Sequence, residues 1–396
     1  MEELAIRRDA ALAVADGRFA WVGRDRDAGR AVRLRRGGRV YDLEGGSIVP
    51  GFVDAHTHVL FAGSRSFEVG LKVRGATYSE IARRGGGIFA TVRSTRAASD
   101  STLLAESGKR LERMNALGST TVEVKSGYAL DHAGELRLLR LVPTLARRTG
   151  LDLVPTYLGA HAIPPRWARN PDGYVREIVD RTLPVVARER LARFCDVFVE
   201  PGFFTVAQAT RILRAASELG LGLKVHADEF LWSGGAALAA RLEARSADHL
   251  LSVRASDIRS LARAGVTAVL LPTTPFASLH PDGSPGRALV DAGVPVALGS
   301  DCSPNSWVES MPLVLAHAVY AARLTPHEAI TAATVNAAHA VGAADRAGRI
   351  AVGRSADFVV FDLPTVAEIP YRIGSIPAAV FRQGNAHSPS KVRPYI

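Results

Sequence analysis

The sequence of 396 residues has few cysteines and lacks the long apolar runs of membrane proteins. Cys195 and Cys302 are its only cysteines, so a disulfide framework is not indicated and the cytoplasm is the expected location. No stretch of about 18 or more apolar residues is free of charge, so we expect no transmembrane helix and no membrane partner. Residues Met1–Arg8 also lack the basic start and apolar run of a signal peptide.

The chain also lacks the stripe of interleaved basic and aromatic residues that single-strand binders use. Its formal net charge of +10 by itself invites a nucleic-acid interpretation. The basic residues are nearly all arginines, however, and they are scattered in short clusters such as Arg33–Arg36. We therefore expect no nucleic-acid partner. The charge is interpreted as a solvated basic surface, which would also favour a small anionic substrate.

What the sequence does have is an alternation of short apolar runs with amphipathic segments, which is typical of a parallel α/β fold. Eight apolar runs, many rich in β-branched residues, are predicted strands: Ser47–His58, Ser119–Lys125, Leu151–His161, Cys195–Glu200, Gly222–Glu229, Ser246–Leu250, Val266–Pro272 and Val294–Asp301. Apolar spacings of three and four predict helices at Ala105–Leu117, Leu136–Arg148, Val175–Glu189 and Val206–Leu219. This pattern predicts a (β/α)₈ barrel at residues 49–345. The alternative, a doubly wound open sheet, lacks its Gly-x-Gly-x-x-Gly turn after the first strand.

The two ends of the chain have a different pattern. Ala11–Gly23 contains two short strand-like runs around Asp16-Gly17, which is a hairpin signal. Arg349–Leu363 and Ala378–Gly384 look similar. We therefore place residues 1–48 and 346–396 together in a small β module that flanks the barrel, joined to it by a helix at Thr325–Val341.

Polar side chains end several of the predicted strands. His56 and His58 are two residues apart, so on a strand both would point the same way. Other polar residues at or near strand ends are His161, His226, Glu229, His249 and Asp301. Each one alone could cap a helix or satisfy a loop, and a lone His-x-His is usually incidental. Because strand ends converge on one face of a barrel, we expect these residues to be neighbours.

Four of these residues form a candidate set of metal ligands. His226 and Asp301, added to His56 and His58, would supply imidazole nitrogens and one carboxylate. Such a set suits zinc or ferrous iron better than magnesium or calcium.

Several motifs resemble a known group of enzymes. Pro50-Gly51-Phe52-Val53-Asp54-Ala55-His56-Thr57-His58 resembles the first-strand signature of the amidohydrolase superfamily. His226–Glu229 resembles its fifth-strand motif, and Ser300-Asp301 ends the eighth strand as the superfamily expects. Finer motifs resemble the imidazolonepropionase family: Phe61–Arg65, Gly85–Ile88, Lys125–Tyr128, Leu158–Pro165 and Ser246–Leu250. Their order and spacing, from about Ala11 to Gly384, are highly specific.

The resemblance implies a metal-dependent hydrolase with one divalent metal, Zn²⁺ or Fe²⁺. It implies hydrolytic ring opening of 4-imidazolone-5-propanoate to N-formimidoyl-L-glutamate, in histidine degradation. The implied metal ligands are His56, His58, His226 and Asp301; Glu229 and His249 would serve in catalysis, and Arg65, Tyr128 and His161 would hold the substrate. A homodimer is left open.

Two alternative functions remain at this point. A deaminase, or another cyclic amide or amidine hydrolase of the same superfamily, would share the metal motifs but would not need Arg65 or the loop at Tyr128. A non-enzymatic scaffold on the same fold is disfavoured by the intact set of candidate ligands.

The chain departs from the family pattern in two places. After the eighth-strand Asp and one more residue, members usually carry Asn-Pro-Gly followed by Thr or Ser, whereas this chain carries Ser303-Pro304-Asn305-Ser306. The substrate contacts at Ser303, Asn305 and Ser306 are therefore expected to differ, with the Asn305 amide compensating for the amide lost at position 303. A strand also usually precedes Ala11, so the N-terminus is short by comparison.

Overall fold

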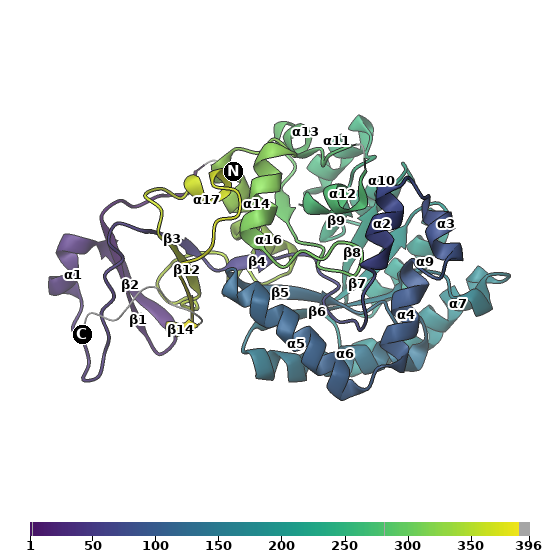
Figure 1. Ribbon diagram of the computed structural model, residues 1–396, viewed down its shortest axis with the longest axis horizontal. Helices are drawn as coiled ribbons and strands as arrows, with labels where there is room; N and C mark the ends of the chain where they lie inside the picture. The colour runs from purple at the N-terminus through teal and green to yellow at the C-terminus, as the bar shows by residue number, and fades with distance from the viewer. Residues whose placement is uncertain (2, 281, 388–396) are drawn as a thin grey trace.

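The computed structural model describes residues 1, 3–280 and 282–387, and it contains an eight-stranded parallel barrel beside a smaller antiparallel region (Figure 1). The barrel strands are β4 (Phe52–Asp54), β5 (Ser119–Lys125), β6 (Asp152–Ala160), β7 (Phe194–Val199), β8 (Gly222–Ala227), β9 (Ser246–His249), β10 (Thr267–Leu270) and β11 (Val296–Leu298). They pair in chain order. Hydrogen bonds from Ala55 N to Leu298 O (3.2 Å) and from Asp301 N to His56 O (3.0 Å) join the first strand to the last. The predicted (β/α)₈ barrel is confirmed.

Helices surround the barrel, and they alternate with its strands along the chain (Figure 1). They are α2 (Phe67–Val73), α3 (Tyr78–Arg83), α4 (Ile88–Ala97), α5 (Asp100–Ala116), α6 (His132–Thr149), α7 (Pro171–Arg176), α8 (Leu183–Arg188), α9 (Val206–Glu218), α10 (Gly235–Arg241), α11 (Ala255–Ala264), α12 (Thr273–Ser278), α13 (Gly286–Asp291), α14 (Met311–Tyr320), α15 (Pro326–Ala333), α16 (Val335–Ala340) and α17 (Glu368–Tyr371). Within the described part of the chain, no helix is both long and apolar enough to cross a membrane.

Two predicted helices are interrupted. The helix expected at Val175–Glu189 contains a wide π-helical turn at Glu177–Thr182, which ends two residues before Pro184, whose missing N–H breaks the regular pattern of hydrogen bonds. The helix expected at Thr325–Val341 divides into α15 and α16 at Thr334 (φ −127°, ψ −85°). Its hydroxyl donates to Ile330 O, four residues earlier, and such bonds bend helices.

The smaller region combines both ends of the described chain. β1 (Ala10–Ala15) and β2 (Arg18–Arg24) form the predicted hairpin, followed by α1 (Asp25–Ala31). A four-stranded antiparallel sheet contains β3 (Ser47–Pro50), β12 (Phe358–Phe361), β13 (Ala379–Arg382) and β14 (Asn385–His387). Residues 388–396 of the predicted module lie outside the described residues.

The single strand predicted at Ser47–His58 was wrong, because the run forms two strands in two different sheets. β3 pairs with β12 in the small sheet, whereas β4 pairs with β5 in the barrel. Gly51 lies between them, and a Cβ there would fall 2.2 Å from Thr120 Oγ1. The expected division at residues 48 and 49 therefore falls inside β3, and we propose that the small module extends to Pro50.

Side chains alternate along the barrel strands and thereby divide the core from the site. Val197 of β7 and Val225 of β8 belong to the apolar cluster shared with the helices, where burying such a side chain contributes about 1.5–3 kcal/mol. Their neighbours along the same strands are equally buried but polar: Asp196, Lys224 and His226. They point into the barrel, so its interior carries buried charges beside an apolar cluster that includes Val154 and Val269.

Candidate active site

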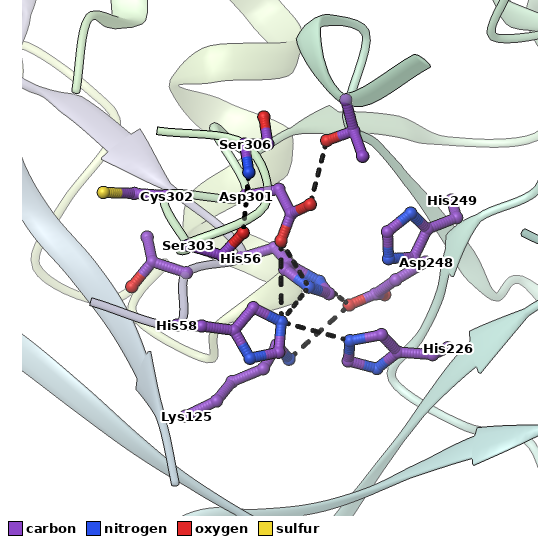
Figure 2. Close-up of polar contacts among 12 residues, drawn as sticks. His56, His58, Lys125, His226, Asp248, His249, Asp301, Cys302, Ser303 and Ser306 are labelled. Carbon is purple, nitrogen blue, oxygen red and sulfur yellow. Dashed lines mark hydrogen bonds and ion pairs between the residues drawn. The ribbon is translucent and has the colours of Figure 1, made fainter. Parts of the chain in front are cut away.

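Three imidazoles and one carboxylate face one another at the carboxyl ends of the strands (Figure 2). His58 Nε2 lies 3.2 Å from His56 Nε2 and 3.3 Å from His226 Nε2. Asp301 Oδ1 lies 3.5 Å from His58 Nε2 and 3.8 Å from His56 Nε2. All four side chains are buried. The fold thus brings together the four residues expected as metal ligands.

His56 and His58 lie just beyond β4, and not on a strand as the sequence predicted. The segment stays extended, because Thr57 forms an isolated parallel bridge with Cys302 in the segment after β11. Residues two apart in extended backbone point to the same side, so both rings still reach the same place.

This donor set fits a divalent metal. Two nitrogens bound to one tetrahedral zinc at about 2.0–2.1 Å would lie about 3.3–3.4 Å apart, close to the 3.2 Å and 3.3 Å observed. Burial lowers the pKa of His56 and of His58 well below its usual value, so these rings are neutral. Neutral imidazoles with converging nitrogens are the ligands that zinc and ferrous iron favour.

Carboxylates lie behind two of the imidazoles. His56 Nδ1 is 2.6 Å from Asp248 Oδ2 in a hydrogen bond, and His226 Nδ1 is 3.0 Å from Asp196 Oδ2. A carboxylate at Nδ1 keeps the proton on that nitrogen and leaves Nε2 free to bind a metal.

A buried network of charges supports these carboxylates from inside the barrel. Lys125 Nζ lies 2.7 Å from Asp196 and 2.9 Å from Glu123, and Lys224 Nζ lies 3.1 Å from Glu123. Figure 2 shows the longer contact of Lys125 with Asp248, at 3.7 Å. Burial would lower the pKa of Lys125, but the charges of Asp196, Glu123 and Asp248 outweigh it and raise the pKa above its usual value.

Sequence reasoning missed this network, although a signal for it was present. Glu123 and Lys125 are the two charged residues of a fully buried strand, and Asp196 and Lys224 interrupt two apolar runs. A charged residue within a buried strand needs a partner of opposite charge nearby. Ion pairs between the charged residues of neighbouring barrel strands could therefore have been predicted from the sequence.

Glu229 and His249 border the same space. His249 Nε2 lies 3.6 Å from Glu229 Oε2, and its ring centroid lies 5.3 Å from that of His56. Burial, followed by the charge of Asp301, raises the pKa of Glu229 well above its usual value. Burial lowers the pKa of His249 well below its usual value, which makes its ring neutral.

The backbone is left-handed at two of these residues. His249 has φ 75° and Asp301 has φ 51°, values that cost non-glycine residues about 1–3 kcal/mol. Asp301 is held there by the hydrogen bond of its N–H to His56 O, and its Oδ2 accepts from Thr274 Oγ1 at 2.9 Å. Strained backbone conformations are common at functional sites, where they orient a side chain at some cost in stability.

Two aromatic rings expected to hold substrate line one side of the imidazole cluster. His161 stacks on His58 with centroids 4.9 Å apart and planes at 19°, and Tyr128 lies 5.3 Å from His161. Burial lowers the pKa of His161 to about 3, so this ring offers neutral hydrogen-bonding groups. Its Nδ1 is 3.1 Å from Gly127 O, which places the proton on that nitrogen.

The remaining expected substrate-binding residues lie in the loops after β4 and β11. Arg65 pairs with Glu68 through Nε and Nη2, both at 2.8 Å, and its Nη2 lies 3.4 Å from Asn305 Oδ1. Ser303 and Ser306 close a turn in which Ser306 N donates to Ser303 Oγ at 3.1 Å. Glu68 therefore accepts from one edge of the guanidinium, and a substrate carboxylate would have to bind at a different edge.

Comparisons with known proteins place the whole chain in a family. Residues 80–380 match the model of the amidohydrolase family. The imidazolonepropionase of Symbiobacterium thermophilum is 46% identical over 387 residues, which cover 97% of this chain and 91% of that protein. The imidazolonepropionase of Syntrophobacter fumaroxidans is 45% identical over 372 residues, covering 93% of this chain and 88% of that protein.

Solved structures share the fold at lower identity. A 5-methylcytosine deaminase from Klebsiella pneumoniae, liganded with 5-fluorocytosine, matches with a TM-score of 0.75 and 17% identity over 98% of this chain and 96% of its own. An adenosine deaminase from Xanthomonas campestris with bound zinc has a TM-score of 0.70 and 20% identity, over 96% of this chain and 88% of its own. These likenesses concern the fold alone, whereas the sequence relatives cover nearly the whole chain at more than 40% identity. The chain therefore belongs to the imidazolonepropionase family of the metal-dependent amidohydrolases.

Proposed function

We propose that this chain hydrolyses 4-imidazolone-5-propanoate to N-formimidoyl-L-glutamate, a step of histidine degradation. The observation that carries the proposal is the buried cluster of His56, His58, His226 and Asp301, in which His58 Nε2 lies within 3.5 Å of the other two ring nitrogens and of the carboxylate, in a chain 46% identical to an imidazolonepropionase. Cytoplasmic location, a homodimer and the absence of nucleic-acid partners stay predictions of the sequence.

One divalent metal, Zn²⁺ or Fe²⁺, would be held by the four side chains of this cluster. When bound, such a metal lowers the pKa of a water molecule from about 15.7 towards about 7, which makes hydroxide available at neutral pH. Asp301 can ligate through Oδ1 because Thr274 occupies its other oxygen. Asp248 orients His56 through a hydrogen bond, and the carboxylate of Asp196 lies 3.0 Å from His226 Nδ1.

Glu229 would carry the proton that hydrolysis must move from water to the leaving ring nitrogen. Its carboxyl group borders the imidazole cluster, and burial together with the charge of Asp301 raises its pKa. A raised pKa keeps more of the carboxyl group protonated near neutral pH, which is the form that acts as a general acid.

His249 would donate a hydrogen bond to the ring carbonyl as negative charge develops on its oxygen. Its Nε2 is buried and has no hydrogen-bond partner within the described residues, so it can meet the substrate. A donor of this kind often contributes about 3–4 kcal/mol to the transition state.

The first prediction is that each chain binds one metal ion. Dinuclear relatives usually bridge their metals with a carbamylated lysine at the end of the fourth strand, whereas Glu200 follows β7 here. Lys125 is held as a cation by its carboxylate partners, so it is unsuited to that modification. Elemental analysis of protein purified without chelator should give one equivalent. Two tightly held equivalents, both required for turnover, would contradict the assignment.

The second prediction concerns Arg65. Arg65→Ala should lower kcat/KM for the carboxylate-bearing substrate by about 10-fold to 150-fold, the equivalent of losing a charge-assisted pair worth about 1.5–3 kcal/mol. Steady-state kinetics measures this, with Arg137→Ala as the control because Arg137 pairs with Asp100 on the outer helices.

Arg65 also neutralises the buried carboxylate of Glu68, so the single variant leaves that charge unpaired. The double change Arg65→Ala with Glu68→Gln removes the unpaired charge and should restore thermal stability without restoring kcat/KM. An unchanged kcat/KM in Arg65→Ala would show that another group holds the propanoate.

The proposed function is tested by assaying purified, metal-loaded protein with imidazolone propanoate and, in parallel, with adenine, guanine and cytosine. The proposal expects release of N-formimidoyl-L-glutamate and no ammonia from the nucleobases. The alternative, a deaminase of the same superfamily, expects the reverse. The deaminases among the structural neighbours share the fold, but their identity of 16–20% carries no substrate assignment.

A further inference from the structure

A lysine that the sequence did not single out meets the loop that departs from the family pattern. Lys72 of α2 donates through Nζ to Asn305 Oδ1 at 2.8 Å, and Arg65 Nη2 lies 3.4 Å from the same oxygen. The amide oxygen of Asn305 thus occupies a position between an ammonium and a guanidinium. Such a position suits a carboxylate oxygen better than a neutral amide, because two cations face it.

Lys72, Arg65 and Glu68 are the charged side chains that the described contacts place around this oxygen, and together they carry one net positive charge. Glu68 is buried, pairs with Arg65 through both carboxylate oxygens and also accepts from Gly87 N at 2.7 Å. Arg65 and Glu68 therefore cancel, and Lys72 adds the extra charge. A single carboxylate would bring the group to neutrality.

The surroundings of Lys72 disfavour its charged form. Burial lowers its pKa, and the charge of Arg65 lowers it further, while Glu68 acts in the opposite sense. An arriving anion would offset both contributions, because its charge is opposite to that of Lys72 and of Arg65. A half-buried ammonium of this kind is a better anion receptor than an exposed lysine, whose charge is screened by water.

The pair of cations lies at the same end of the barrel as the imidazole cluster. Arg65 follows His58 by seven residues in the segment after β4, and Asn305 follows Asp301 by four residues in the segment after β11. These two segments are hydrogen-bonded to each other through His58 N and Cys302 O at 3.0 Å. A substrate held at the cluster by its ring could therefore extend a short acidic chain towards Lys72.

We propose that Lys72 is a specificity-determining residue: with Arg65 it binds the propanoate carboxylate of the substrate, and the Asn305 amide oxygen occupies that place in the absence of substrate. The proposal rests on the proposed function, because it assigns the acidic end of that substrate. It also explains how a side chain can replace the usual glycine at position 305, since the Asn305 amide swings aside when the carboxylate binds.

The test compares two substrates that differ only in charge, imidazolone propanoate and its propanamide analogue. Lys72→Met should lower kcat/KM for the propanoate at least tenfold, mainly through KM, and should change kcat/KM for the propanamide less than threefold. Lys72→Arg should recover most of the loss. Lys109→Met is the matched control, because Lys109 is an exposed lysine of α5, and it should change neither substrate.

A second variant probes the occupant of the site. Asn305→Asp puts a carboxylate of the same shape between Lys72 and Arg65, where it should compete with the substrate. We expect KM for the propanoate to rise at least tenfold and the melting temperature to rise as well. If Lys72→Met and Asn305→Asp each affected both substrates equally, or affected neither, Lys72 would have only a structural role and the proposal would be wrong.

A binding measurement separates this proposal from the proposed function. Calorimetry with imidazole-4-propanoate and its amide reports carboxylate preference without turnover. Should the wild type fail to hydrolyse imidazolone propanoate, the proposed function falls. The anion site would still stand if the wild type preferred the propanoate probe at least tenfold and Lys72→Met abolished that preference. Equal binding of the two probes by the wild type would refute the anion site.

Discussion

Glu229→Gln is expected to lower kcat by about 10²–10⁴-fold while the metal content stays at the wild-type level. The amide keeps the shape of the side chain but cannot accept the proton of the attacking water or pass it to the leaving nitrogen. Stopped-flow or steady-state kinetics, together with elemental analysis of the same sample, measures both quantities.

Glu200→Gln is the matched control for this change. Glu200 is a second buried carboxyl group close by, whose pKa burial raises to about 7, but it is occupied by the backbone N–H groups of Glu229 and Leu231. A glutamine there keeps an acceptor oxygen for one of these two N–H groups and does not touch the proposed proton shuttle, so kcat should fall less than tenfold. A near-normal kcat in Glu229→Gln would show that another group shuttles the proton.

His226→Ala is expected to lose metal and activity together, with kcat reduced at least about 10³-fold. Removing an outer partner of a metal ligand typically costs 10-fold to 100-fold in metal affinity, and removing the ligand itself should cost more. The variant also leaves Asp196 without its imidazole neighbour, so folding must be checked by circular dichroism.

The control for this variant is His317→Ala, since His317 lies on α14 against Phe276, away from the imidazole cluster. It should retain one equivalent of metal. The informative result is the contrast between His226→Ala and Glu229→Gln. Loss of a metal ligand should remove metal and activity together, whereas loss of the proton shuttle should remove activity alone. Full metal content in a folded His226→Ala protein would remove His226 from the set of ligands.

The barrel and its imidazole cluster were predictable because both depend on local patterns. Apolar runs ending in polar residues predict parallel strands, and strand ends converge wherever eight such strands close a barrel. His226 and Asp301 could therefore be placed beside His56 without any knowledge of the loops between them. The order of the strands required no further information, because neighbours in the chain are neighbours in the barrel.

Other features depend on contacts that no local pattern encodes. The division of Ser47–His58 into two strands depends on pairing with β12 and with β5, both far from it in the sequence. The contact of Lys72 with Asn305 joins residues 233 positions apart. Arg65 lies just before α2 and Glu68 lies in its first turn, yet only the fold shows that Lys72 meets Asn305 beside this pair.

The most direct test of the central claim is hydrolysis of imidazolone propanoate by metal-loaded protein in water enriched in ¹⁸O. Attack of water on the ring carbonyl, with cleavage of the adjacent bond to nitrogen, predicts one ¹⁸O atom in the new carboxylate of N-formimidoyl-L-glutamate. The rate of labelling should follow metal content and should fall with Glu229→Gln. Label in the one-carbon unit derived from the ring, or labelling no faster than in a protein-free sample, would contradict the account.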